Sequence, residues 1–190
     1  MEISQLGPIA TSVAVGYFLG SIPVAHLVVR SRGLNILETG NRNPGAANVF
    51  RTVSRPLGAL VFALDALKAF LAVTMANVLG VELTEVTAVA GAAAIVGHWY
   101  PIFFRFKGGA GLAAALGASL AVAPLPALAA FALGLVTIMV IRNTGYAALV
   151  GYVGLVGLSL FLDTSWEVTL AATLLAVMVF LHNIAMHRFQ

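Results

Sequence analysis

The chain alternates between long, continuously apolar segments and short segments rich in glycine, asparagine and arginine. Seven apolar segments cover residues 8–29, 57–79, 86–104, 110–123, 126–141, 145–162 and 166–184. A helix of about 17–25 apolar residues crosses the hydrocarbon core of a bilayer. Because the segments are apolar without alternation, they indicate helices and not barrel strands. The pattern predicts an all-α, polytopic membrane protein with about seven transmembrane helices.

The composition supports this prediction. Of the 190 residues, 61% are hydrophobic and 9% are charged, and the mean hydropathy is +1.00. A soluble domain carries roughly 25% charged residues, so this chain has too few for a water-exposed surface. The first apolar segment is too long for a signal-peptide core, and we expect it to be retained as a span. Without a long polar linker, residues 1–190 are expected to form one domain.

The charged residues between the spans alternate in sign. Nine of the ten basic residues fall in one set of connecting segments: Arg30, Arg32, Arg42, Arg51, Arg55, Arg105, Lys107, Arg142 and Arg188. Five of the seven acids fall in the other set: Glu2, Glu82, Glu85, Asp163 and Glu167. Cytoplasmic loops of membrane proteins carry the excess of Lys and Arg. The N-terminus is therefore predicted outside and the C-terminus in the cytoplasm.

Two details of the bundle follow from proline and glycine. Residues 107–142 begin and end on the same side, and Ala123-Pro124-Leu125-Pro126 is a plausible external turn. We favour two short helices there over one re-entrant pair. The first span carries Gly16 and Gly20 on one face, and the sixth carries Gly151, Gly154 and Gly157. Such faces favour close helix packing, with a dimer interface as the alternative.

A long basic segment follows the first span and contains Thr-Gly-Asn-Arg-Asn-Pro-Gly-Ala-Ala-Asn at residues 39–48. Its glycines allow the backbone to approach a ligand closely, and successive amide N–H groups can bind an anion. Arg42 and Arg51 can each hold a phosphate through two hydrogen bonds. The alternative is a glycine- and asparagine-rich turn whose arginines lie near lipid headgroups. Composition alone does not choose between these interpretations.

A second basic loop reads Phe-Phe-Arg-Phe-Lys-Gly-Gly-Ala-Gly at residues 103–111. It precedes a predicted helix, whose N-terminus attracts anions. The loop lacks the spacing and the Lys-Ser/Thr pair of a Walker A motif. Its aromatic residues favour interfacial anchoring over ligand contact. For His98, just before the loop, we favour a hydrogen-bonded structural role.

Two further polar groups lie inside or at the end of predicted spans. Asp65 and Lys68 are three residues apart on one helix face, so we expect them to neutralise each other inside the bundle. A proton relay in a small transporter is the alternative. His182 and His187 near the C-terminus do not share a helix face and have no carboxylate nearby, so no metal site is predicted.

Taken together, these segments resemble the PlsY family, the bacterial glycerol-3-phosphate acyltransferases that use acyl phosphate. The loop at 39–51 is similar to the family motif Gly-Ser-Gly-Asn-x-Gly-Ala-Thr-Asn-x-x-Arg. The resemblance extends over nearly the whole chain. It also includes Gly20-Ser21, Gly33, Asp65, Lys68, Gly97-His98-Trp99-Tyr100-Pro101, Phe103-Phe104 and Phe106-Lys107-Gly108-Gly109.

The resemblance implies transfer of a fatty acyl group from acyl phosphate to the 1-hydroxyl of glycerol 3-phosphate, giving lysophosphatidate for phospholipid synthesis. It implies a multi-pass protein of the bacterial plasma (inner) membrane, surrounded by lipids, without a cofactor or nucleic-acid partner. The implied catalytic residues are Asn41, Asn43, Arg51 and His182. The implied phosphate- and substrate-binding residues are Gly40, Arg42, Gly45, Asn48, Lys107, Gly108, Gly109, Gly111, Arg142 and Asn183.

The chain departs from the family motifs at several positions. This chain has Asn41 where the family motif has serine, and Arg42 where the motif has glycine. It likewise has Ala47 in place of a threonine and Ala110 in place of a lysine. One preorganised donor contributes roughly 2.7–4 kcal/mol to a transition state. The departures leave three hypotheses open: a rewired site for the same substrates, a different phosphate or alcohol, or lost catalysis. A non-catalytic protein that binds a phosphorylated lipid or metabolite is therefore the alternative function, and a small transporter is the third.

Overall fold

The computed structural model describes residues 3–78 and 84–188, and within these ranges it contains helices and turns but no strand. The all-α prediction is confirmed. The elements in chain order are α1 (Ile3–Gly20), α2 (Val24–Arg30), η1 (Ile36–Glu38), α3 (Ala46–Thr52), α4 (Arg55–Val78), α5 (Thr84–Trp99), η2 (Ile102–Phe104), α6 (Leu112–Val122), α7 (Pro124–Ile141), α8 (Thr144–Phe161) and α9 (Trp166–Arg188).

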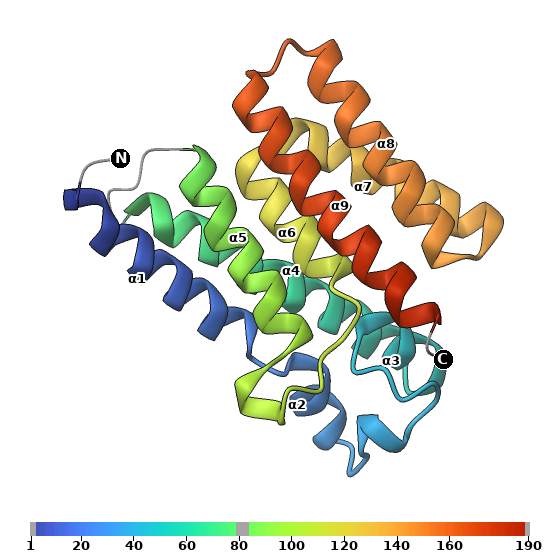
Figure 1. The fold of residues 1–190 in the computed structure, drawn as a ribbon. Helices are drawn as coiled ribbons and strands as arrows, with labels where there is room; N and C mark the ends of the chain where they lie inside the picture. Colours follow the sequence, from blue (N-terminus) through green and yellow to red (C-terminus); the bar gives the residue numbers. More distant parts are fainter. Residues whose placement is uncertain (1–2, 79–83, 189–190) are drawn as a thin grey trace.

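The long helices form one bundle, with the short elements gathered at one end (Figure 1). Helix α1 packs against α4 and α5, and α4 also packs against α6. Helix α9 contacts α5, α6 and α8, while α7 and α8 form an antiparallel pair at the side of the bundle. Helices α2 and α3 lie at the lower end in Figure 1, where the chain also ends. This end holds both basic loops.

Within residues 3–78 and 84–188, six helical segments are long and apolar enough to cross a membrane, and α6 is a shorter apolar helix. With 11 residues, α6 is about 17 Å long, against a hydrocarbon core of about 30 Å. The chain does turn between α6 and α7, but only Ala123 lies outside the helices, and residues 124–126, which were predicted as part of the turn, form the start of α7. The seventh crossing and the orientation across the membrane stay predictions.

The predicted span at residues 8–29 lies within a segment, Leu6–Arg30, that is long and apolar enough to cross a membrane, but its helix is interrupted. Helix α1 ends at Gly20 and α2 begins at Val24. Pro23 has no N–H and cannot continue the hydrogen-bond ladder, so the helix breaks in front of it. In a membrane, the carbonyl groups freed by such a break need partners within the protein. The carbonyl of Ile22 receives one from the side chain of Lys68.

Small side chains bring the helices together. The largest buried cluster lies among α4, α5, α6 and α9 and is mostly alanine. A side chain at Gly16 or Gly20 would strike the α5 backbone, so this predicted packing face is confirmed. Gly151 and Gly154 likewise face α7, whereas Gly157 has open space around it and is not a packing position.

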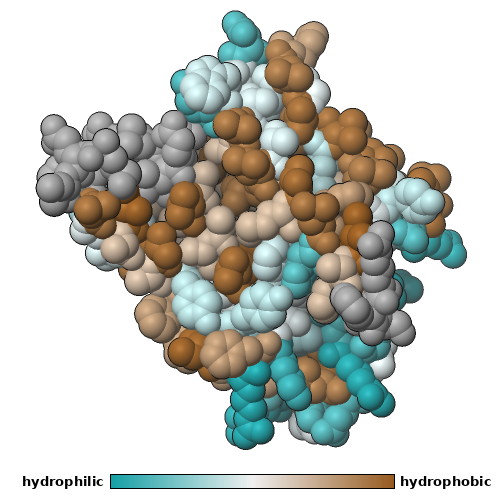
Figure 2. Space-filling model, in the orientation of Figure 1, coloured by the Kyte–Doolittle hydropathy of each residue, from teal (hydrophilic) through white to brown (hydrophobic). Residues whose placement is uncertain are grey.

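The sides of the bundle expose large apolar residues, such as Phe161 at 83%. Figure 2 shows apolar surface over the helices and polar surface gathered at the end that carries α2 and α3. This distribution is that of a protein whose sides face lipid. Of the charges used to predict orientation, Glu2 and Glu82 and the side chains of Glu85 and Arg188 lie outside the described residues.

Candidate active site

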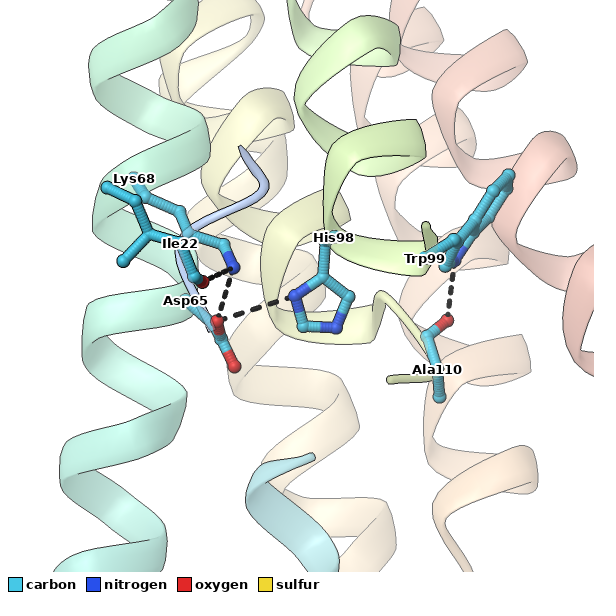
Figure 3. A network of polar contacts seen from close by, with 6 residues as sticks. All are labelled: Ile22, Asp65, Lys68, His98, Trp99 and Ala110. Carbon is cyan, nitrogen blue, oxygen red and sulfur yellow. Dashed lines mark hydrogen bonds and ion pairs between the residues drawn. The ribbon is translucent and has the colours of Figure 1, made fainter. Parts of the chain in front are cut away.

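A buried group of charged side chains lies at the polar end of the bundle, beneath the two basic loops (Figure 3). The Nζ atom of Lys68 is 2.8 Å from Oδ1 of Asp65, so the predicted pairing is confirmed. Nδ1 of His98 lies 3.4 Å from the same oxygen. Asp65 is 1% exposed, and Lys68 and His98 are each 6% exposed. Burial of charge in this way is tolerated only with partners, and here α4 and α5 supply them.

The second basic loop folds back onto the end of α5. We call residues 107–111 the glycine turn. The N–H of Gly109 donates to the carbonyl of His98 at 3.3 Å. A Cβ at Gly109 would lie 2.7 Å from Nε2 of His98 and 3.0 Å from the carbonyl oxygen of Pro44. Only glycine fits this approach, so the turn, the His98 ring and the long loop meet at one point.

Two side chains from other helices hold the next residue of the glycine turn. The carbonyl oxygen of Ala110 accepts from Nε1 of Trp99 at 3.2 Å and from Nδ2 of Asn183 at 3.0 Å. Trp99 ends α5 and Asn183 lies near the end of α9. The ring of His182 stacks on Trp99, with ring centroids 3.9 Å apart. The glycine turn is therefore fixed by α5 and α9 together.

The long loop is organised around one buried asparagine. Asn48 donates to the carbonyls of Thr39 at 2.9 Å and Asn43 at 3.0 Å. Its Oδ1 accepts from the Asn41 N–H and from the Thr52 hydroxyl, both at 3.3 Å. All these partners lie within 39–52, so the loop folds largely on itself.

Arg42 sits in this loop with φ of 62°, in the left-handed region that favours glycine. This is the position at which the motif it resembles has glycine. A glycine would adopt this conformation without strain, whereas an arginine rarely does. The Arg42 side chain is exposed.

The two loops meet at a cavity of about 10 Å³, which is roughly room for one water molecule. Its lining includes Pro44 from the long loop, Lys107, Gly108 and Gly109 from the glycine turn, and Asp65, Lys68 and His98 beneath them. His26 from α2 also lines it, with its ring 4.3 Å from that of Phe104. The cavity is narrow and is lined by positive and negative groups.

A larger groove of about 470 Å³ lies between α8 and α9. Its lining combines apolar residues such as Leu149 and Phe180 with the polar residues Asn143 and Asn183. Because Asn183 also bonds to Ala110, the groove adjoins the glycine turn. A mostly apolar groove with a few polar groups suits an amphiphilic ligand.

The structure brings together some of the predicted site residues and leaves others apart. Lys107, Gly108 and Gly109 share the cavity, while Asn183 and Gly111 lie beside it. Residues Gly40, Asn41, Asn43, Gly45 and Asn48 shape the long loop. Arg42, Arg51 and Arg142 are exposed, and their side chains make no ion pair or hydrogen bond with the described residues. None of the three lines the cavity.

Sequence reasoning missed three residues at this end of the molecule. Nε1 of Trp99 donates to the carbonyl of Ala110, and the carbonyl of Pro44 lies close to Gly109. No local sequence pattern predicts either contact. Asn143 caps α8 by accepting from the N–H groups of Gly145 and Tyr146. Its signal was visible, because asparagine directly before an apolar helical segment is a common N-cap.

Comparison with known proteins gives consistent matches over almost the full chain. The family model described as glycerol-3-phosphate acyltransferase matches residues 10–189. A glycerol-3-phosphate acyltransferase of Thermosipho melanesiensis is 35% identical, covering 91% of this chain and 86% of the relative. One of Myxococcus xanthus is 37% identical and covers 90% of both chains.

Two crystal structures of PlsY, an integral membrane glycerol 3-phosphate acyltransferase, share the fold. The glycerol 3-phosphate form superposes with a TM-score of 0.82 and the lysophosphatidic acid form with 0.83. Each is 30% identical to this chain, and the match covers 95% of this chain and 91% of the other.

Proposed function

This chain belongs to the glycerol-3-phosphate acyltransferase family, and we propose that its acyl donor is acyl phosphate and its product lysophosphatidate. It is a multi-pass membrane glycerol-3-phosphate acyltransferase. We propose that it resides in the bacterial plasma (inner) membrane as a single domain, with both basic loops in the cytoplasm. One PlsY structure holds glycerol 3-phosphate and the other lysophosphatidic acid, which supports these two as acceptor and product.

One observation carries the proposal: the two basic loops meet, with Pro44 against Gly109 and Lys107 on the cavity lining. The Lys107 side chain and the N–H groups of Gly108, Ala110 and Gly111, which donate to no residue in the described part of the chain, are suited to an anionic phosphate at the start of α6. Arg42 and Arg51 are exposed near this end and unpaired among the described residues, so they are free to add charge. An anionic acceptor and an amphiphilic donor would both be met at this polar end of the bundle.

The reaction then needs positioning and charge stabilisation above all. The 1-hydroxyl oxygen of glycerol 3-phosphate attacks the acyl carbonyl carbon, and a C–O bond forms. The bond from that carbon to the phosphate oxygen breaks, and inorganic phosphate leaves with the hydroxyl proton. Asn43 keeps a buried Oδ1 without a hydrogen-bond partner among the described residues, so it can orient the hydroxyl. Groups held in place before the reaction lower its barrier most effectively.

The groove between α8 and α9 is the place we propose for the acyl chain. Its apolar side chains match a hydrocarbon tail, and Asn183 links its polar part to the glycine turn. The donor phosphate would then lie between the turn and Arg142, which follows α7 beside Asn143. His182, stacked on Trp99, would complete this side of the site.

The second candidate is a member of the fold that binds phosphorylated ligands without turnover. Ala110 favours it, because the motif that this turn resembles has a lysine there. The transporter hypothesis has lost its only support, since Asp65 and Lys68 are paired and buried.

The deciding experiment uses the purified full chain in nanodiscs with palmitoyl phosphate and labelled glycerol 3-phosphate. Labelled lysophosphatidate should form, and Lys107→Ala should reduce its rate. No product above that of Lys107→Ala would overturn the proposed activity. Thermal stabilisation by glycerol 3-phosphate without product would establish the binding alternative.

A further inference from the structure

Asp65 touches two neighbours with one oxygen, and they lead to different parts of the molecule. Lys68 connects it to the helix break after α1, because Nζ of Lys68 also donates to the carbonyl of Ile22 at 2.9 Å. His98 connects it to the end of α5 and, beyond that, to the glycine turn. Both Lys68 and His98 line the small cavity of the candidate site, but only His98 also contacts the glycine turn.

His98 supports the glycine turn in two ways. Its carbonyl oxygen accepts the N–H of Gly109, and its ring edge at Nε2 lies against the Cα of the same residue. Pro44 contacts Gly109 from another direction. The imidazole therefore lies against Gly109, where the glycine turn meets the long loop. Figure 3 shows the His98 ring directed from α5 toward Asp65 on α4.

The contact with Asp65 fixes the orientation of this ring. If the ring turned away, the buried carboxylate would keep only Lys68 as a close neighbour. Such a loss is costly because a buried charge relies on every partner it has. Neither Oδ1 nor Oδ2 of Asp65 has a regular hydrogen-bond partner in the described part of the chain, so the close contacts with Lys68 and His98 have to offset its burial. The pair is thus held together by the burial of the carboxylate.

We propose that Asp65 and His98 are positioning residues: Asp65 fixes the His98 ring, and the ring holds the glycine turn so that Lys107 faces the acceptor phosphate. The inference rests on the proposed function for the identity of the ligand. It gives Asp65 a second task besides neutralising Lys68. A carboxylate that served Lys68 alone would become dispensable as soon as the lysine was replaced.

A double-mutant comparison separates the two tasks. Lys68→Met removes the cation and leaves Asp65 to His98, while Asp65→Asn strands the cation. The double variant Asp65→Asn/Lys68→Met removes both charges and keeps the volume nearly constant. Because the double variant leaves no stranded charge, it should melt closer to the wild type than Asp65→Asn does, although it also loses the Lys68 hydrogen bond to Ile22. In the double variant His98 has lost its carboxylate.

The test measures KM and kcat for glycerol 3-phosphate, with palmitoyl phosphate as donor, in nanodiscs. We expect the double variant to raise KM about tenfold to a hundredfold over the wild type, because a small displacement of a binding group has effects of that order. Lys68→Met should raise KM less than the double variant does, because the contact between Asp65 and His98 remains. His98→Asn keeps an N–H near the position of Nδ1 but removes the ring edge, so it should raise KM like the double variant.

Hydrogen exchange of the peptide that contains Gly109 gives a second readout, independent of turnover. The double variant should exchange this peptide faster than the wild type and Lys68→Met, with unchanged exchange in α7 and α8. A double variant with wild-type KM and wild-type exchange would overturn the inference. A wild type without turnover would refute the proposed activity, and the exchange result would then decide the positioning role by itself.

Discussion

The two basic loops at the polar end are built in different ways. The glycine turn is held from outside, by His98 and Trp99 of α5, by Asn183 of α9 and by the long loop at Pro44. The long loop is held mainly from inside, by the four hydrogen bonds of the Asn48 side chain. The polar contacts of the turn therefore come from the rest of the bundle, whereas those of the long loop come from its own residues, and Val49 packs the long loop against Val29 and Val61.

This difference explains how the site tolerates departures in its motifs. In the turn, the backbone makes the structural contacts, so Ala110 can replace a lysine without loss of the bond to Asn183. In the long loop, Arg42 takes up the left-handed conformation of a glycine and keeps its side chain exposed. Changes in the turn should therefore affect the whole site, and changes at the exposed arginines should affect only ligand affinity.

The largest effect is expected from Gly109→Ala. The added Cβ would lie within 3.0 Å of both His98 and Pro44, so one loop has to move away from the other. We expect acyltransferase activity to fall about a hundredfold. The control is Gly157→Ala in α8, where nothing lies within 4 Å of the added Cβ. Equal activities of the two variants would show that the loops need not touch.

The next effect concerns the exposed charge of the turn. Lys107→Ala should raise KM for glycerol 3-phosphate about tenfold to a hundredfold, because a hydrogen bond to a charged group contributes about 1.5–3 kcal/mol. Its melting temperature should not change, since the Lys107 side chain is exposed and bonds to none of the described residues. Arg32→Ala, also exposed at the polar end, is the matched control. The same rise in KM in both variants would indicate a general charge effect.

A smaller effect is expected inside the long loop. Asn48→Asp keeps the acceptor oxygen for Asn41 and Thr52 but loses the donors to Thr39 and Asn43. Loss of such bonds costs about 1–3 kcal/mol, which should loosen the loop and lower activity about tenfold. Hydrogen exchange should rise in residues 39–45 and stay constant in the glycine turn. Faster exchange in both loops would contradict their separate construction.

The smallest effect is expected at Arg42. Replacing Arg42 by glycine suits φ of 62° but removes an exposed charge, so KM for glycerol 3-phosphate should rise by no more than about fivefold. If Arg42 makes up for the lysine that is absent at Ala110, then Ala110→Lys should restore KM in the Arg42→Gly background. A double variant with a higher KM for glycerol 3-phosphate than Arg42→Gly would show that Arg42 does not compensate for the absent lysine.

Local patterns in the sequence predicted much of this structure. The apolar segments predicted the helices, and the spacing of three residues predicted the pairing of Asp65 with Lys68. The break at Pro23 was missed because the apolar pattern runs through it, although proline itself was a visible signal.

The contacts that assemble the candidate site could not be predicted in this way. Asp65 and His98 come from different helices, and Asn183 reaches Ala110 from the far end of the chain. These pairs depend on how whole helices pack, and no local pattern encodes them. The motifs identified which residues matter but not which of them hold the others in place.

The most direct test is an experimental structure of the full chain with bound glycerol 3-phosphate. The phosphate should lie about 3 Å from Nζ of Lys107 and from N–H groups of the glycine turn, with Gly109 still against Pro44. A phosphate held by Arg51 away from the turn, or a turn separated from Pro44, would contradict the account.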